Sequence, residues 1–293
     1  MTASIYVTGG QPSLDLDFAG QSYRQGPALG YQTTGWKTAR DIHVYDGGSW
    51  KKSQSVYIRN GGTWKQMHVA EVPSLGDAFF GGYYAGLYNL GGAYYYALIV
   101  APKANQVNVS NYQSYPSYMA YGTNNYDGLF NSSQAASAYP FHIGNIAASA
   151  FNSVIGGYDD WYLPSLYELE VIYYNLKPTN QNNDTSSSTG NNFYSVPRRS
   201  GQYYTTSSPA QTSLSAFQAG GSQAFDLDTD TSGQIQSIYA TSTNLGYGST
   251  QVYGIHFMAD TSPSVSPGKQ VTVAMTGVDL VYRPIRKMQV YVP

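Results

Sequence analysis

The sequence predicts an α+β protein that is mostly β, and three observations support this prediction. The chain of 293 residues contains 30 tyrosines, and tyrosine is enriched in β-strands. Several of its 31 glycines follow an aspartate, an asparagine or another glycine between alternating apolar and polar runs, a pattern typical of strands joined by tight turns. Clear helix signals are confined to short segments, of which residues 165–176 are the clearest.

The composition argues against several functional classes. The chain has no cysteine, so it has no disulfide framework and no thiolate chemistry. Its 15 basic and 17 acidic side chains give a net charge of −2, which argues against nucleic acid as a partner. The most apolar stretch, residues 94–102, is far shorter than the roughly 20 residues that span a bilayer. Residues 1–4 begin no signal-peptide pattern, so we expect synthesis in a cytoplasm without export.

Charge and an internal repeat divide the chain into two parts. Residues 1–70 carry 7 basic and 4 acidic side chains, whereas residues 71–293 carry 8 and 13. Residues 42–51 are echoed by residues 56–65, and each copy contains a strand, an Asp-Gly or Asn-Gly turn and a second strand. We therefore expect a small β-hairpin module over residues 1–70 and a separate domain over residues 71–293.

The hairpin module needs further partners, because two hairpins of this size cannot bury a core alone. The partners can come from this chain, as in a plain β-meander, or from another protein, as in a docking module. Residues 1–35 are rich in glycine and contain chain-breaking Gln-Pro and Gly-Pro pairs. We therefore expect no regular structure in residues 1–35.

The larger domain begins with a hairpin pattern followed by short helices. Residues 79–86 lead through a Gly-Gly turn into residues 94–100, which predicts a hairpin whose second strand is buried. Residues 127–139 form a short helix pattern that ends before a proline. Residues 143–154 are rich in alanine and predict another short helix.

The clearest helix begins after Ser165. Ser165 is the predicted N-cap and Glu168 stands three residues later, which makes a capping box. Apolar residues at helical spacing from Leu169 to Leu176 give the helix one inward face. The polar tract at residues 179–192 is expected to form a mobile surface loop, and the rest of the chain alternates strand and turn patterns.

Several phrases in this domain occur together in a fixed order. They are Gly81–Gly86, Ala97–Pro102, Gly122–Asn124 with Asp127, Gly128 and Asn131, Gly156–Ser165 with Glu168 and Leu169, and Arg283–Arg286. This set resembles the domain that ends the Legionella collagen-like adhesin, a C-type-lectin-like fold also found in phage tail fibres and receptor-binding proteins. The resemblance covers about residues 75–288, and its most specific phrase is Gly-Gly-Tyr-Asp-Asp-Trp-Tyr-Leu-Pro-Ser before the capped helix. It implies a C-type-lectin-like domain preceded by the small β-hairpin module.

The sequence departs from the family after the helix. The family's Tyr-Trp-Ser-Ser-Thr phrase has two candidates here, residues 203–208 and residues 239–244, and neither contains the tryptophan. Either a strand-and-loop unit is duplicated or a long insertion separates the two ends. A short tail, residues 287–293, also runs past the family's usual end.

The matched phrases supply the expected scaffold. Trp161 should anchor the start of the helix in the core, Asp160 should tie down the preceding turn, and the two arginines near the end should meet carboxylates. The expected scaffold residues are Asp160, Trp161, Ser165, Glu168, Arg283 and Arg286.

One metal site can be proposed from the sequence. Asp226, Asp228 and Asp230 stand at alternate positions, and hard oxygen ligands at this spacing suit calcium. The segment lacks the glycine and the bidentate glutamate of an EF-hand loop. The alternative is an exposed turn in which water screens the carboxylates. No other cofactor is predicted.

The resemblance places the recognition face in the late strands and loops. Aromatic rings there can stack on sugars or anchor a protein interface, and their alternative role is core packing. The candidate receptor-binding residues are Tyr203, Tyr204, Tyr239, Asn244, Tyr247, Tyr253 and His256.

Catalysis is not expected. The four histidines show no metal-protease spacing, and the chain contains neither a Gly-x-Ser-x-Gly elbow nor a complete phosphate loop. Formylglycine-generating enzymes share the lectin-like fold, but their chemistry depends on cysteine. Glu168 and Glu170 are a carboxylate pair only in sequence.

The resemblance implies a phage virion protein, made in the host cytoplasm, that acts as a tail fibre or receptor-binding protein. Residues 1–70 would join other virion proteins, and the larger domain would bind a host-surface glycan or protein. A homo-oligomer is expected, with a trimer as the usual form of fibre tips. The alternative is a structural virion protein, such as a tail adaptor or a capsid decoration. A bacterial adhesin and a hydrolase of host polysaccharide are the remaining alternatives.

Overall fold

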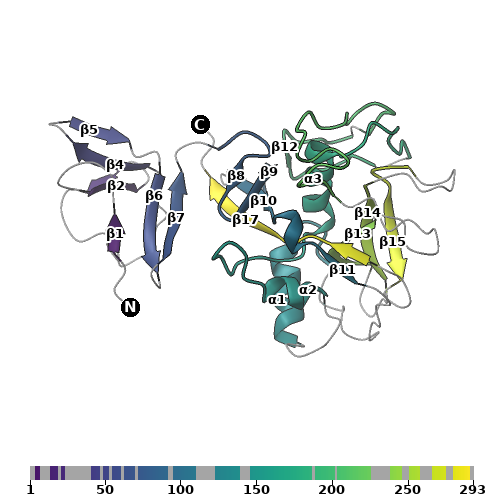
Figure 1. The fold of residues 1–293 in the computed structure, drawn as a ribbon, viewed down its shortest axis with the longest axis horizontal. Helices are drawn as coiled ribbons and strands as arrows, with labels where there is room; N and C mark the ends of the chain where they lie inside the picture. The colour runs from purple at the N-terminus through teal and green to yellow at the C-terminus, as the bar shows by residue number, and fades with distance from the viewer. Residues whose placement is uncertain are drawn as a thin grey trace. The chain divides into compact units, whose positions relative to one another are not determined.

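The computed structural model shows a fold that is mostly β, with three short α-helices among the residues it describes, so the predicted class is confirmed. Two compact units are present (Figure 1), Met1–Val72 with Val290–Pro293, and Pro73–Gln289. The division falls close to the predicted one at residue 70. The described residues are 4–6, 14–18, 21–23, 41–46, 49–52, 55–60, 63–69, 72–91, 95–109, 123–138, 146–186, 189–201, 203–225, 238–245, 251–257, 266–274 and 280–290.

The smaller unit contains the two predicted hairpins, each in its own antiparallel sheet. In the first hairpin Asp46 pairs with Ser49, and in the second Asn60 pairs with Thr63, so each loop has two residues. The four-stranded sheet has the order β3-β2-β4-β5 and the three-stranded sheet the order β1-β6-β7. The strands are β1 Ser4–Tyr6, β2 Leu14–Phe18, β3 Gln21–Tyr23, β4 Asp41–Asp46, β5 Ser49–Lys52, β6 Ser55–Asn60 and β7 Thr63–Val69.

Strands from the beginning of the chain complete these two sheets. β1 pairs with β6, and β2 pairs with β4. The expectation that residues 1–35 have no regular structure is therefore wrong. The apolar and polar residues of Leu14–Phe18 alternate, and this pattern fits a strand beside the first hairpin. The hairpins thus find sheet partners within this chain.

The larger unit has two sheets. One has the order β12-β9-β10-β17, with β8 paired to β9, and the other has the order β11-β16-β13-β14-β15. Its first strands, β9 and β10, form the predicted hairpin. The first sheet contains β8 Ala78–Phe79, β9 Gly82–Tyr88, β10 Tyr95–Val100, β12 Ser195–Val196 and β17 Ile285–Val290. The second contains β11 Val107–Val109, β13 Ile238–Asn244, β14 Gln251–His256, β15 Gln270–Ala274 and β16 Leu280–Tyr282.

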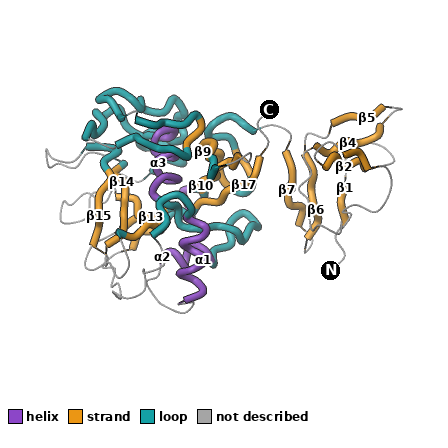
Figure 2. Tube along the Cα trace, turned by 180° about the vertical axis from the view of Figure 1, so that it is seen from behind, coloured by secondary structure: helices purple, strands orange, loops and turns teal. Residues whose placement is uncertain are grey.

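The three predicted helices are present. They are α1 Gly128–Ala138, α2 Ile146–Phe151 and α3 Leu166–Leu176, and a 3₁₀ turn covers Lys103–Asn105. In Figure 2 α3 lies between the sheet that contains β9 and β10 and the sheet that contains β13 and β14. Within the described residues, no helix is long and apolar enough to cross a membrane.

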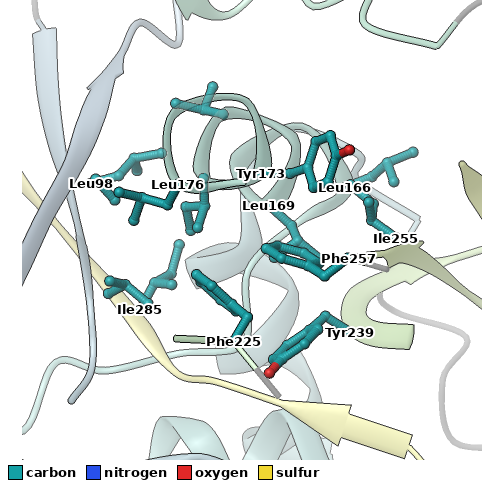
Figure 3. Packing of buried hydrophobic residues seen from close by; sticks show 14 of the residues in the cluster. Leu98, Leu166, Leu169, Tyr173, Leu176, Phe225, Tyr239, Ile255, Phe257 and Ile285 are labelled. Atoms are coloured by element: carbon teal, nitrogen blue, oxygen red, sulfur yellow. The ribbon is translucent and has the colours of Figure 1, made fainter. Parts of the chain in front are cut away.

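The main core surrounds α3 (Figure 3). The inward face of the helix packs against buried side chains of both sheets and against aromatic rings from the loop before β13 and from the end of β14. Burial of this apolar area is the main stabilising contribution to the unit. The labelled core residues are Leu98, Leu166, Leu169, Tyr173, Leu176, Phe225, Tyr239, Ile255, Phe257 and Ile285.

The turn that precedes α3 is fixed as predicted. Trp161 is fully buried and its indole Nε1 donates to the carbonyl of Ile155 at 3.0 Å. Gly156 has a φ of 60°, and a Cβ there would lie 2.7 Å from the Cα of Gly81. Only glycine fits at this close approach without displacing backbone. The phrase that begins at Gly156 and the phrase that begins at Gly81 therefore contact each other.

The predicted capping box of α3 is confirmed. The Oγ of Ser165 accepts from the Glu168 amide at 3.4 Å, and the Oε2 of Glu168 accepts from the Ser165 amide at 2.8 Å. The same Oε2 accepts from the amide of Gly128, the first residue of α1, at 3.0 Å. Burial raises the pKa of Glu168, while Lys287, 3.8 Å from its Oε1, opposes that rise. One buried carboxylate thus joins the beginnings of two helices.

The two arginines near the end of the chain behave differently. Arg286 forms an ion pair with Asp160 at 2.7 Å, which confirms the predicted carboxylate partner and the role of Asp160 in the turn. Arg283 is buried and donates to the carbonyls of Ala101 and Gln223. Its donors also reach the side-chain oxygen of Gln223, and the carboxylate predicted for Arg283 stays a prediction.

The polar tract after α3 is packed rather than loosely exposed. Asn183 is buried, accepts from the hydroxyl of Tyr173 at 2.8 Å and donates to the carbonyl of Pro209 at 2.9 Å. Asn192 is also buried and donates to Glu170 at 2.6 Å. The expectation of a mobile surface loop is therefore wrong for these positions, because their amides satisfy buried polar groups on α3 and the loop beyond it.

Candidate recognition surface

Most of the predicted receptor-binding residues that are described lie in the core. Their burial removes them from any surface of the single chain, so this part of the prediction is wrong. The buried residues are Tyr204, Tyr239, Asn244 and His256. Tyr203, by contrast, is 54% exposed, and Tyr253 is half-buried. Tyr247 lies outside the described residues.

The physical reasons for this burial are specific. The hydroxyl of Tyr204 donates to the buried carboxylate of Glu170. The ring of Tyr239 packs edge-on against Phe225, with centroids 5.0 Å apart, and lies 4.7 Å from the ring of Phe257. Strand patterns in the sequence do not distinguish a tyrosine that faces the core from one that faces solvent when both faces of the sheet are covered.

The candidate calcium ligands Asp226, Asp228 and Asp230 lie outside the described residues. Within the described part of the chain, no group of three or more histidine, aspartate or glutamate side chains could hold a metal ion. The calcium site therefore stays a prediction.

The structure brings together a different set of aromatic residues. Tyr126, Tyr167 and Tyr194 come from three separate segments, and we call them the tyrosine platform. The rings of Tyr126 and Tyr194 stack with centroids 4.8 Å apart and an interplanar angle of 20°. The ring centroid of Tyr194 also lies 5.7 Å from that of Tyr167 and 5.8 Å from that of the buried Tyr88. Tyr126 is 37% exposed, so the stack reaches solvent.

Backbone hydrogen bonds hold the stacked pair in place. The hydroxyl of Tyr88 donates to the carbonyl of Tyr126 at 2.9 Å, and the side chain of Asn124 accepts from the Tyr126 amide at 2.9 Å. The carbonyl of Tyr194 accepts from the amide of Asn89 at 2.8 Å. A surface fixed in this way loses little conformational entropy when it binds a ligand.

Tyr167 is positioned by the first turn of α3. Its amide donates to the carbonyl of Asn125 at 3.0 Å, which links the helix to the loop that carries Tyr126. Burial raises the pKa of Tyr167, and the negative charge of Glu170 and the nearby Tyr253 add to that rise. Tyr253, which the sequence analysis selected, therefore lies within electrostatic range of the platform.

Phe193 and Arg198 stand beside the platform. Phe193 is 43% exposed, and the guanidinium carbon of Arg198 lies 4.7 Å from the centre of its ring, which is a cation–π contact. Burial raises the pKa of Tyr194, and the positive charge of Arg198 opposes that rise. Arg198 thus contacts Phe193, which directly precedes Tyr194 of the platform in the chain.

A buried network beneath the surface fixes this segment to α3. Glu170 accepts from the guanidinium of Arg199, from the side-chain amide of Asn192 and from the hydroxyl of Tyr204. The guanidinium of Arg199 also lies 4.0 Å from the ring centre of Tyr174. Burial raises the pKa of Glu170, while Arg199 opposes the rise. The network anchors both ends of the segment that carries Phe193, Tyr194 and Arg198.

This arrangement suits noncovalent recognition. It offers aromatic faces of large area and one exposed guanidinium, which are the groups enriched at binding hot spots. Glu168 and Glu170, the two carboxylates of α3, are each buried among their own hydrogen-bond donors. Neither carboxylate is part of the exposed surface.

Comparison of the chain with models of protein families, with curated proteins and with solved structures finds no match.

Sequence reasoning did not select the residues of this surface. The tyrosine platform joins segments that are distant in the chain, and no local pattern reveals that Tyr126 stacks on Tyr194. A weak signal is the Phe193-Tyr194 pair followed by the two arginines Arg198 and Arg199, directly after a polar tract. Exposed aromatics and arginine close together are typical of interfaces.

Proposed function

We propose that the chain is a phage virion protein, a tail fibre or receptor-binding protein, whose larger unit binds the host cell surface. The smaller hairpin unit would join other virion proteins. The observation that carries this proposal is the tyrosine platform with Phe193 and Arg198 beside it. Tyr126, Phe193 and Arg198 are exposed, Tyr167 and Tyr194 are half-buried, and hydrogen bonds within the unit hold the platform in place.

The proposal includes a C-type-lectin-like fold for Pro73–Gln289. Two features support it. The Gly156–Ser165 phrase buries Trp161 and caps α3, which is the role that the resemblance implies for it. The early strands β9 and β10 share a sheet with the late strand β17, so the beginning and end of the unit meet.

The proposed mechanism is noncovalent recognition without catalysis. A shallow surface with a few aromatic rings binds a single site weakly. Several copies on one particle, in a homo-oligomer, would convert weak sites into stable attachment through the effective concentration of the second contact. Release of one site then leaves the particle attached through the others.

Competition for adsorption tests this function. The purified full-length chain is mixed with host cells before phage is added, and free phage is counted over time. We expect the native chain to slow adsorption, and Tyr126→Ala to need about fivefold more protein for the same effect, since a hot-spot aromatic contributes 1 kcal/mol or more. Val154→Ser is the control, because Val154 is 69% exposed and its loss removes a comparable apolar surface outside the platform.

The position of the chain in the particle separates the proposal from the structural alternative. Gold labelling at the distal end of a fibre is the expected result. Labelling between tail rings or on the capsid, together with no effect of the native chain on adsorption, would instead identify a tail adaptor or a decoration protein.

A further inference from the structure

Arg198 differs from the other arginines of the larger unit. Arg199, Arg283 and Arg286 are buried, and each donates hydrogen bonds to oxygen atoms of the unit. Arg198 is exposed, and none of the ion pairs within the described residues includes it. Its guanidinium is held beside the ring of Phe193 by the cation–π contact. An exposed guanidinium that stacks on a ring keeps its N–H donors available at its edge.

The neighbours of Arg198 indicate what kind of ligand its N–H donors could bind. Phe193, whose ring the guanidinium contacts, directly precedes Tyr194 in the chain, and the ring of Tyr194 stacks on that of Tyr126 with centroids 4.8 Å apart. A guanidinium binds carboxylate or phosphate oxygens in a two-pronged geometry. The flat aromatic faces offer a place for the apolar face of a sugar ring. The guanidinium and the aromatic rings together match a ligand that has both an acidic group and a sugar ring.

The charge of the rest of the unit makes this contact selective. Residues 71–293 carry 13 acidic and 8 basic side chains, so the unit as a whole repels anions. The net charge of the unit therefore does not attract an anionic ligand from a distance. Such a ligand would be bound only through direct contact with the guanidinium of Arg198. A polyanion that has no ring to fit the platform would gain little binding free energy from this surface.

We infer that the surface formed by Tyr126, Tyr194, Phe193 and Arg198 binds a sugar that carries a carboxylate or a phosphate group. The sugar ring lies against the exposed ring of Tyr126, and its acidic group receives the N–H donors of Arg198. This inference rests on the proposed host-surface function and narrows its ligand class to acidic glycans.

Saturation-transfer NMR on the full-length chain tests this ligand class. The probes are glucose, glucuronate and glucose 6-phosphate at equal ionic strength. We expect transfer from the protein to both acidic sugars and about fivefold weaker binding of glucose, the effect of an exposed ion pair of about 1 kcal/mol. Comparable binding of glucuronate and glucose 6-phosphate indicates shared acid recognition, whereas a preference for one identifies the acidic group.

Three substitutions at two positions separate the effect of charge from that of shape. Arg198→Gln should remove the preference for the acidic sugars, and Arg198→Lys should keep part of it because the charge remains while the planar stacking is lost. Tyr126→Ala should weaken all three sugars together. Both positions are exposed, so the melting temperature should change little. Equal binding of the three sugars, or an acid preference that survives Arg198→Gln, would overturn the inference.

The adsorption assay distinguishes this failure from failure of the proposed function. Periodate treatment of the host cells oxidises surface sugars and should abolish competition by the native chain. If competition survives periodate but is lost after the cells are treated with protease, the receptor is a protein, so the acidic-glycan inference is wrong while host binding stands. If the native chain never competes and no sugar binds, both proposals are wrong.

Discussion

Glu170 shows how a single buried charge supports an exposed surface. Its carboxylate is fully enclosed, yet Arg199, Asn192 and Tyr204 supply hydrogen-bond donors from one connected segment. The free energy of this network depends on complete pairing, because removal of one partner leaves a buried acceptor unsatisfied. These buried residues therefore hold the segment that carries Phe193, Tyr194 and Arg198 in place.

The hydroxyl of Tyr204 tests this dependence. We expect Tyr204→Phe to lower the free energy of unfolding by about 1.5–3 kcal/mol, since it removes a hydrogen bond to a charged group. Tyr203→Phe is the matched control, because Tyr203 is exposed, and it should change stability by less than about 0.5 kcal/mol. Denaturant unfolding of both variants measures the difference. Equal stability of the two would show that Glu170 does not need this donor.

At the scale of elements, α3 organises the larger unit. Its first turn carries Tyr167 of the platform and Glu168 of the capping box, and its inward face packs against both sheets. The capping carboxylate also receives the first amide of α1. A change at the cap should therefore affect more than one helix end.

Ser165→Ala tests the cap. Loss of an N-cap side chain lowers the free energy of unfolding by about 1 kcal/mol in most helices, and up to about 2. We expect the upper end of that range, because the Oγ of Ser165 also donates to Glu168 at 2.9 Å. Ser207→Ala is the control at an exposed serine. A loss no larger than that of the control, measured by thermal or denaturant unfolding, would contradict the role of the cap.

Elements that rest on local signals were predictable, and those that rest on distant partners were not. Residues 165–176 carry their cap and apolar face within a dozen positions, so the helix could be predicted. The packing of Asn183 and Asn192 depends on Tyr173 and Glu170, which no neighbouring residue reveals. The tyrosine platform could not be predicted for the same reason. The strands within residues 1–35 were also missed, because they pair with the distant hairpin strands β6 and β4.

At the scale of the whole molecule, the buried tyrosines determine the alkaline limit of stability. Burial raises the pKa of Tyr84 to about 12, and it raises the pKa of Tyr162 and Tyr204 well above the usual value. In the unfolded chain the same hydroxyls ionise near pH 10. Above that pH the unfolded state binds fewer protons than the folded state, so stability falls as pH rises.

Alkaline titration measures this effect. Each such tyrosine should lower the free energy of unfolding by about 1.4 kcal/mol per pH unit above pH 10. We expect ultraviolet absorbance to show exposed tyrosines ionising first and the buried ones ionising together with the loss of circular dichroism. Lys177 acts in the opposite direction, because burial lowers its pKa from 10.5 to about 8. Between these two pH values the unfolded state binds more protons at Lys177 than the folded state, so this residue raises the free energy of unfolding as pH rises. A smooth ionisation of all tyrosines near pH 10 without unfolding would contradict their burial.

The central claim is that the tyrosine platform faces the host cell, and site-specific photo-crosslinking tests it most directly. p-Benzoylphenylalanine replaces Tyr126 in the chain carried by intact particles, and the control carries it at Val154. After illumination during adsorption, we predict crosslinks from position 126 to a component of the host envelope and few from position 154. Crosslinks from position 126 only to other virion proteins, or equal yields from both positions, would contradict the claim.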